Sequence, residues 1–100
     1  MNELRTEWPF SDPPNVAVFT SKRILDGDEW IYYVSHDKDD GAWQFHAKSG
    51  ATQENEARVV GLRTMFEIDH TIGLLADLPL GWCAWREGRQ SSWQRRERVE

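Results

Sequence analysis

Hydrophobic residues are most frequent in residues 58–86, and the first part of this segment has the spacing of a helix. In residues 62–68 the apolar side chains recur three and four positions apart, which predicts a short amphipathic helix. Asp69 or Thr71 is suited to cap a second short helix, and Pro79 stops that helix because proline cannot donate a backbone hydrogen bond. The pattern therefore predicts two consecutive helices in the centre of the apolar stretch.

Shorter stretches rich in β-branched and aromatic residues are typical of strands. The Asp-Gly pairs at 26–27 and 40–41 favour tight hairpin turns, which makes the first three strands an antiparallel meander. Trp43 and Phe45 alternate with polar neighbours, so their shared face is expected in the core. The predicted strands are residues 16–21 or 16–25, followed by residues 30–36, 42–47, 59–60, 82–86 and 93–96.

These elements predict an α+β fold, with an antiparallel sheet of four or five strands and two short helices packed on one face. Residues 1–15 contain three prolines and are expected to form an extended arm, either pinned by Trp8 and Phe10 or freely mobile. Residues 16–96 form the single domain, and the charged residues 97–100 are expected to fray. The expected core is Val18, Ile31, Tyr33, Trp43, Phe45, Val60, Leu62, Phe66, Ile72, Leu75, Leu78, Trp82 and Cys83.

Composition narrows the class of protein. With 39% hydrophobic residues and six tryptophans, the 100-residue chain is expected to fold as one small domain. It has no apolar run near the roughly 20 residues that a membrane helix needs. One cysteine cannot form an internal disulfide, which favours a cytoplasmic location. The net charge of −5 favours basic partners over nucleic acid.

Candidate catalytic and metal-binding residues give weak patterns. Cys83 lies in an apolar strand, where a thiol is usually buried and inert. His36 and His46 flank the acidic turn at residues 37–40, so a small metal-dependent enzyme using these residues is the alternative to a binding protein. The turn lacks the ligand positions of a calcium loop. We therefore expect no catalytic residue, no bound metal and no cofactor.

The arginine-rich end of the chain is a candidate nucleic-acid surface, because arginine and tryptophan stack on bases. Three glutamates dilute the five arginines there, and the rest of the chain is acidic, so this function is disfavoured. A solvated tail or an internal ion pair to the acidic sheet is the alternative. The residues concerned are Arg86, Arg89, Arg95, Arg96 and Arg98, interleaved with Trp85 and Trp93.

Protein binding fits the composition better, since tryptophan, tyrosine and arginine are the residues that anchor protein interfaces. The aromatic residues could equally cover the second face of the sheet and bind nothing. A homodimer is a further open alternative. The residues expected to contact a partner are Trp8, Trp30, Tyr32, Asp37, Asp39, Asp40 and Trp93.

Three segments carry a resemblance to a known family: residues 40–45 (DGAWQF), 62–69 (LRTMFEID) and 77–82 (DLPLGW). Residues 16–86, which contain them, resemble a bacterial domain family of unknown function that is grouped with the immunity proteins of polymorphic toxin systems. The resemblance implies an α+β fold without a cofactor. It also implies a stoichiometric protein that binds and blocks a basic toxin.

Overall fold

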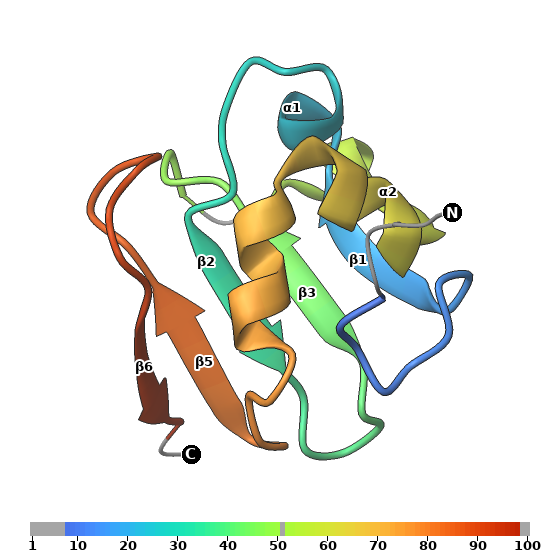
Figure 1. Cartoon of the computed structure of the whole chain (residues 1–100). Helices are drawn as coiled ribbons and strands as arrows, with labels where there is room; N and C mark the ends of the chain where they lie inside the picture. Colours follow the sequence, from blue (N-terminus) through green and yellow to red (C-terminus); the bar gives the residue numbers. More distant parts are fainter. Residues whose placement is uncertain (1–7, 51, 99–100) are drawn as a thin grey trace, which may run out of the picture.

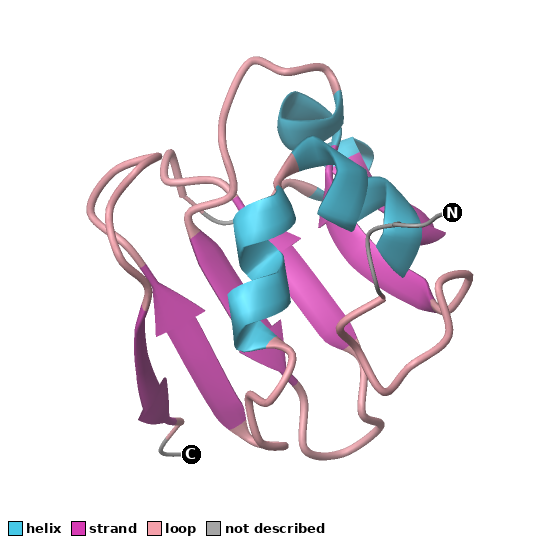
Figure 2. Ribbon diagram, in the orientation of Figure 1, coloured by secondary structure: helices cyan, strands magenta, loops and turns pink. Residues whose placement is uncertain are grey.

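The computed structural model describes residues 8–50 and 52–98. They form an α+β domain around one six-stranded mixed sheet, shown in Figures 1 and 2. The strands are β1 (Ala17–Ser21), β2 (Tyr33–His36), β3 (Trp43–His46), β4 (Ala57–Gly61), β5 (Trp82–Trp85) and β6 (Gln94–Glu97), in the spatial order β4-β1-β3-β2-β5-β6. The helical segments are α1 (Lys22–Leu25), the 3-10 turn η1 (Glu54–Glu56), α2 (Leu62–Ile68) and the 3-10 segment η2 (His70–Leu75).

The prediction of the α+β class is confirmed, but the predicted sheet is wrong in size and in direction. It has six strands, and β1 runs parallel to β3 instead of forming a hairpin with β2. The cause lies at Ser21, whose hydroxyl accepts a hydrogen bond of 3.0 Å from the Arg23 N–H and caps α1. The chain therefore leaves the sheet at the point where the sequence suggested a continuing strand, and Gly27 (φ 84°) follows a helix instead of closing a hairpin.

The α2 segment and η2 lie side by side over one face of the sheet in Figure 1. The bounds predicted for α2 are confirmed, and Asp69 caps η2 by accepting a hydrogen bond from the Thr71 N–H at 2.9 Å. The buried residues of this covered face come from the helices and from alternate strand positions. They are Val18, Ile24, Val34, Trp43, Phe45, Leu62, Met65, Ile72, Leu75, Leu78 and Ala84, with Phe10, Ile31 and Ala47 beside them.

The predicted core is correct for most positions. Val60, Phe66 and Trp82 are half-buried and pack against the core, whereas Tyr33 is half-buried and lies outside it. In the β2–β3 hairpin Val34 lies opposite Phe45, and Tyr33 lies opposite His46. Val34 therefore points into the core, and Tyr33 points to the other face. Cys83 is buried as expected, yet it lies outside the hydrophobic cluster because it shares the face of Tyr33.

The N-terminal segment is described from residue 8 onwards. Phe10 is buried, and its ring lies 5.5 Å from that of Trp43 in an edge-to-face arrangement. Asp12 accepts a hydrogen bond of 2.8 Å from the Trp43 indole and one of 2.6 Å, at its carbonyl oxygen, from Trp8. These contacts tie residues 8–12 to the covered face, while the first part of the expected arm lies outside the described residues.

Candidate functional site

The second face of the sheet, which we call the uncovered face, lies on the side opposite α2 and η2, which are seen over the sheet in Figure 1. The strand register places alternate side chains on it. Its centre is polar and aromatic, and its β1–β4 side is apolar, with Phe19 44% and Val59 60% exposed. Small residues at the centre are buried by larger neighbours on the same face. The residues of the uncovered face are Phe19, Tyr33, Ser35, Gln44, His46, Val59, Cys83, Trp85 and Arg96.

A chain of hydrogen bonds crosses the centre of this face. Thr52 Oγ1 lies 3.1 Å from His46 Nδ1, and His46 Nε2 lies 3.0 Å from Gln44 Oε1. Gln44 Nε2 donates to Asp37 Oδ2 at 2.7 Å. Ser35 and Arg98 both donate to the other carboxylate oxygen of Asp37, at 3.1 and 3.2 Å.

The carboxylate of Asp37 fixes which group donates and which accepts in each of these hydrogen bonds, because an ionised carboxylate can only accept hydrogen bonds. Gln44 must donate its amide to Asp37, which leaves its oxygen facing His46. His46 therefore carries its proton on Nε2, and Nδ1 accepts from the Thr52 hydroxyl. Burial lowers the pKa of His46, although the charge of Asp37 opposes this shift, so the neutral ring is favoured.

Tyr33 and Cys83 lie beside this chain. Burial and a hydrogen bond with Cys83 raise the pKa of Tyr33 to about 12, so its hydroxyl stays protonated. Cys83 is only 2% exposed. Its thiol therefore fits the expectation of a packing residue, and the nearby partner is a phenol rather than an imidazole.

The uncovered face has a hollow at each end of the hydrogen-bond chain. Near the β2–β3 turn, a polar hollow of about 510 Å³ is lined by Asp37, Lys38, Asp39, Asp40, Gln44 and Arg98. At the other end, a more apolar hollow of about 310 Å³ is lined by Tyr32, Tyr33, His46, Ala47, Lys48 and Gly50. Trp85, with Arg96 stacked 5.6 Å from its ring, lies on the neighbouring strands. Together these groups form one continuous polar and aromatic surface.

The structure brings four of the seven expected partner-binding residues to this surface. Asp37 belongs to the hydrogen-bond chain, Asp39 and Asp40 are exposed at its rim, and Tyr32 lines the apolar hollow. Trp8 lies elsewhere, packed against Phe66 on the covered side with ring centroids 5.5 Å apart.

Trp30 and Trp93 also lie elsewhere, where both stack on Arg86, at 5.6 and 4.2 Å. Arg86 is 1% exposed, so it is not available as the nucleic-acid contact that its place in an arginine-rich segment suggested. It donates two hydrogen bonds to the Ile31 carbonyl oxygen, at 2.9 and 2.7 Å, and one of 2.5 Å to Asp69. Both tryptophans therefore hold the junction between the β5 end and η2.

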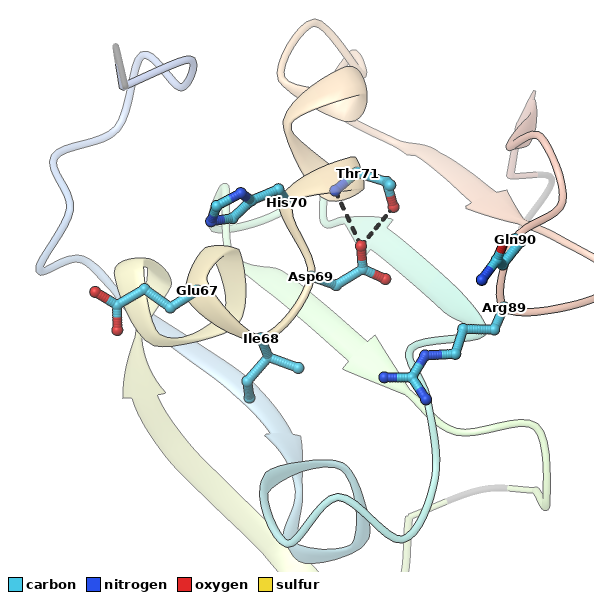
Figure 3. Close-up of a pocket in the computed structure, with 7 residues that line it drawn as sticks. All are labelled: Glu67, Ile68, Asp69, His70, Thr71, Arg89 and Gln90. Atoms are coloured by element: carbon cyan, nitrogen blue, oxygen red, sulfur yellow. Dashed lines mark hydrogen bonds between the residues drawn. The ribbon is translucent and has the colours of Figure 1, made fainter. Parts of the chain in front are cut away.

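Asp69 caps η2 and also accepts a hydrogen bond from Arg86. Burial raises its pKa, but hydrogen bonds from Thr71 and Arg86 outweigh that effect, and the pKa lies below its usual value. Figure 3 shows the open hollow beside it, lined by Glu67, Ile68, Asp69, His70, Thr71, Arg89 and Gln90. Both oxygens of Asp69 already accept hydrogen bonds, from Thr71 and Arg86, so its carboxylate serves the helix cap and the ion pair.

The expectation that His36 and His46 approach each other is wrong. They lie at opposite ends of the β2–β3 pair, where His36 is opposite Trp43 and His46 opposite Tyr33. They also lie on opposite faces, because His36 stacks on Trp43 at 3.9 Å and its Nδ1 is 2.8 Å from the Leu78 carbonyl oxygen. Within residues 8–50 and 52–98, no three or more His, Cys, Asp and Glu side chains cluster as a metal site would require.

Sequence reasoning missed Gln44, Thr52 and Arg98 as members of the candidate site. The alternation of Gln44 with Trp43 and Phe45 placed it on the second face, but nothing local indicated its partners. Arg98 was assigned to the fraying end, whereas its N–H donates to the Gly81 carbonyl oxygen at 2.8 Å and its side chain binds Asp37.

The chain matches no protein-family model, and no curated protein or solved structure is significantly similar to it. The resemblance to the immunity family therefore stays a prediction. In the part of the chain that the structure describes, every helix is too short or too polar to cross a membrane.

Proposed function

We propose that this chain is a non-enzymatic protein-binding domain whose binding surface is the uncovered face of the sheet. The observation that supports it is the composition of that face, where half-buried Tyr33 and Trp85 lie beside Arg96 and Arg98. Tyrosine, tryptophan and arginine carry most of the binding energy in protein interfaces. Their presence together on one face therefore favours a binding surface over a simple cover of the sheet.

The hydrogen-bond chain through His46, Gln44 and Asp37 prepares this surface for binding. Each side chain is held by a neighbour at 2.7 to 3.1 Å, so little side-chain freedom remains to be lost when a partner docks. Gln44 is the central member, since it joins His46 on one side to Asp37 on the other. The surface is therefore rigid before a partner arrives.

The charge of the chain defines the kind of partner. The net charge is −5, and Asp39 and Asp40 are exposed at the rim of the binding surface. Such a charge accelerates association with basic proteins and repels phosphate backbones. A basic toxin neutralised in the cytoplasm, as the family resemblance implies, fits this description.

The test is capture of a protein by the tagged chain from lysate of its native cells at low salt, with two matched variants. Trp85→Ala removes an aromatic side chain from the uncovered face, and Leu74→Ala removes an apolar side chain that is 70% exposed on η2. We expect Trp85→Ala to weaken capture about 30-fold or more and Leu74→Ala to leave it unchanged.

Three results would contradict the proposal. They are failure of the native chain to capture any protein, equal capture by both variants, and capture of nucleic acid in place of protein. Thermal unfolding of Trp85→Ala shows whether the variant is folded, and a captured basic protein should be released by salt.

A further inference from the structure

The exposed backbone of edge strand β4 carries an inference independent of the proposed function. The Leu62 N–H donates to the Val16 carbonyl oxygen at 2.9 Å, which fixes the hydrogen-bonding phase of the β1–β4 pair. Since hydrogen-bonded pairs alternate in antiparallel strands, Val60 and Arg58 bond to β1. The N–H and C=O groups of Ala57, Val59 and Gly61 therefore point outward, away from the sheet.

We propose that β4 pairs with β4 of a second copy of this chain, in antiparallel direction about a two-fold axis at Val59. In this register Val59 faces Val59 of the second copy, and Ala57 faces Gly61 of the second copy. The two Val59 residues can exchange two N–H···O bonds. The Ala57 N–H already donates to the Glu54 carbonyl oxygen, and the Gly61 carbonyl oxygen caps the start of α2. Each Ala57–Gly61 pair therefore contributes one bond, from the Gly61 N–H to the Ala57 carbonyl oxygen. A two-fold axis requires such a self-complementary surface.

The side chains around β4 support the same register. Val59 is 60% exposed, and Phe19, its neighbour on β1, is 44% exposed on the same face. Pairing would place each Val59 against its symmetry mate and cover this apolar pair. Glu54 precedes β4 and Arg63 follows it, and both are exposed, so antiparallel pairing brings opposite charges together at both ends.

The strand at the other edge of the sheet, β6, is much more highly charged than β4. All four residues of β6 are exposed, and Arg95, Arg96 and Glu97 are charged, which is how edge strands avoid pairing. In β4 the only charged side chain is Arg58, whose guanidinium donates to the Ala57 and Asn55 carbonyl oxygens at 2.9 and 3.1 Å. Pairing replaces the bond to Ala57, so the dimer is weak and depends on concentration.

Sedimentation equilibrium of the full chain up to about 1 mM tests this dimer, because a dissociation constant in that range is typical of a small interface. Val59→Pro removes an outward N–H that is not used by β1, and edge strands tolerate proline at such positions. Glu97→Pro is the matched control at the other edge, where the Arg98 N–H donates to Gly81 and the N–H of Glu97 points outward. We expect a native dimer that Val59→Pro weakens at least 10-fold and that Glu97→Pro leaves intact.

A native chain that stays monomeric overturns the proposal, as does a dimer broken by Glu97→Pro alone. If circular dichroism shows that Val59→Pro does not fold, variants of the charged residues at the two ends of β4 test the dimer instead. Arg63→Glu should weaken the dimer several-fold, and adding Glu54→Arg should restore it. Loss without restoration contradicts the predicted register.

Discussion

The two faces of the sheet are stabilised by different interactions, although the same strands form both. The covered face is closed by apolar side chains such as Val34, Phe45 and Leu75, all at most 1% exposed. The uncovered face is closed by hydrogen bonds through Gln44 and Asp37. We therefore expect stability to depend mainly on the covered face, as our proposal that the uncovered face binds a partner requires.

The largest expected effect comes from Arg86, a charged side chain that is 1% exposed and donates to both Ile31 and Asp69. Arg86→Ala leaves the Ile31 carbonyl and the part-buried Asp69 without their main partner. We expect a loss of about 3 to 5 kcal/mol in the free energy of unfolding, measured by urea denaturation. Arg89→Ala, an exposed neighbour, should change it by less than about 0.5 kcal/mol. Equal losses for the two variants would contradict the structural role of Arg86.

Leu75→Ala tests the apolar part of the covered face. Leu75 is 1% exposed and lies on η2 over the sheet, so truncation leaves a cavity in the core. The expected loss is about 2 to 5 kcal/mol by the same measurement. Leu74→Ala, one residue away and exposed, is the control, and a loss of only a few tenths of a kcal/mol for Leu75→Ala would show that the η2 packing is wrong.

Gln44→Ala tests how much the uncovered face contributes to the free energy of unfolding. It breaks the bonds to Asp37 and His46, which are part-buried, and we expect a loss of about 1 kcal/mol. The same variant should weaken partner capture, because the side chains of Asp37 and His46 lose the hydrogen bonds from Gln44 that hold them in place. A loss as large as that of Leu75→Ala would remove the distinction between the two faces.

The smallest effect is the pH dependence that His46 contributes. Its pKa is lowered in the folded state, first by burial, so the unfolded chain binds a proton more readily. The stability contribution is complete above the usual value of 6.5 and is lost as the pH falls from there toward the folded pKa. His46→Gln should flatten the curve of unfolding free energy against pH in this window, and an unchanged slope would contradict the assignment.

Local patterns predicted the parts of the fold that depend on neighbours in sequence. The spacing of Leu62, Met65 and Phe66 sets the bounds of α2, and the Asp-Gly pair at 40–41 predicts the β2–β3 hairpin, where Gly41 has φ 73°. The parallel pairing of β1 with β3 has no local signal, because the chain between them could have returned on either side of β1.

The candidate site was harder to predict because its members meet only through strand register. Two consecutive tyrosines, Tyr32 and Tyr33, made either face of β2 plausible, and only the pairing of Val34 with Phe45 decides between them. Gln44 and Arg98 are 54 positions apart in the printed sequence and are joined through Asp37. An arginine after an apolar strand is usually exposed. The sequence left an internal ion pair open for the whole arginine cluster, but it did not single out Arg86 as the buried member.

Hydroxyl-radical footprinting of the chain with its captured partner tests the central claim most directly, because it reports on single side chains on each face. The account predicts that Tyr33, His46 and Trp85 lose reactivity in the complex, while His70 and Leu74 on the covered side keep theirs. Protection of His70 and Leu74, with Trp85 as reactive as in the free chain, would contradict it.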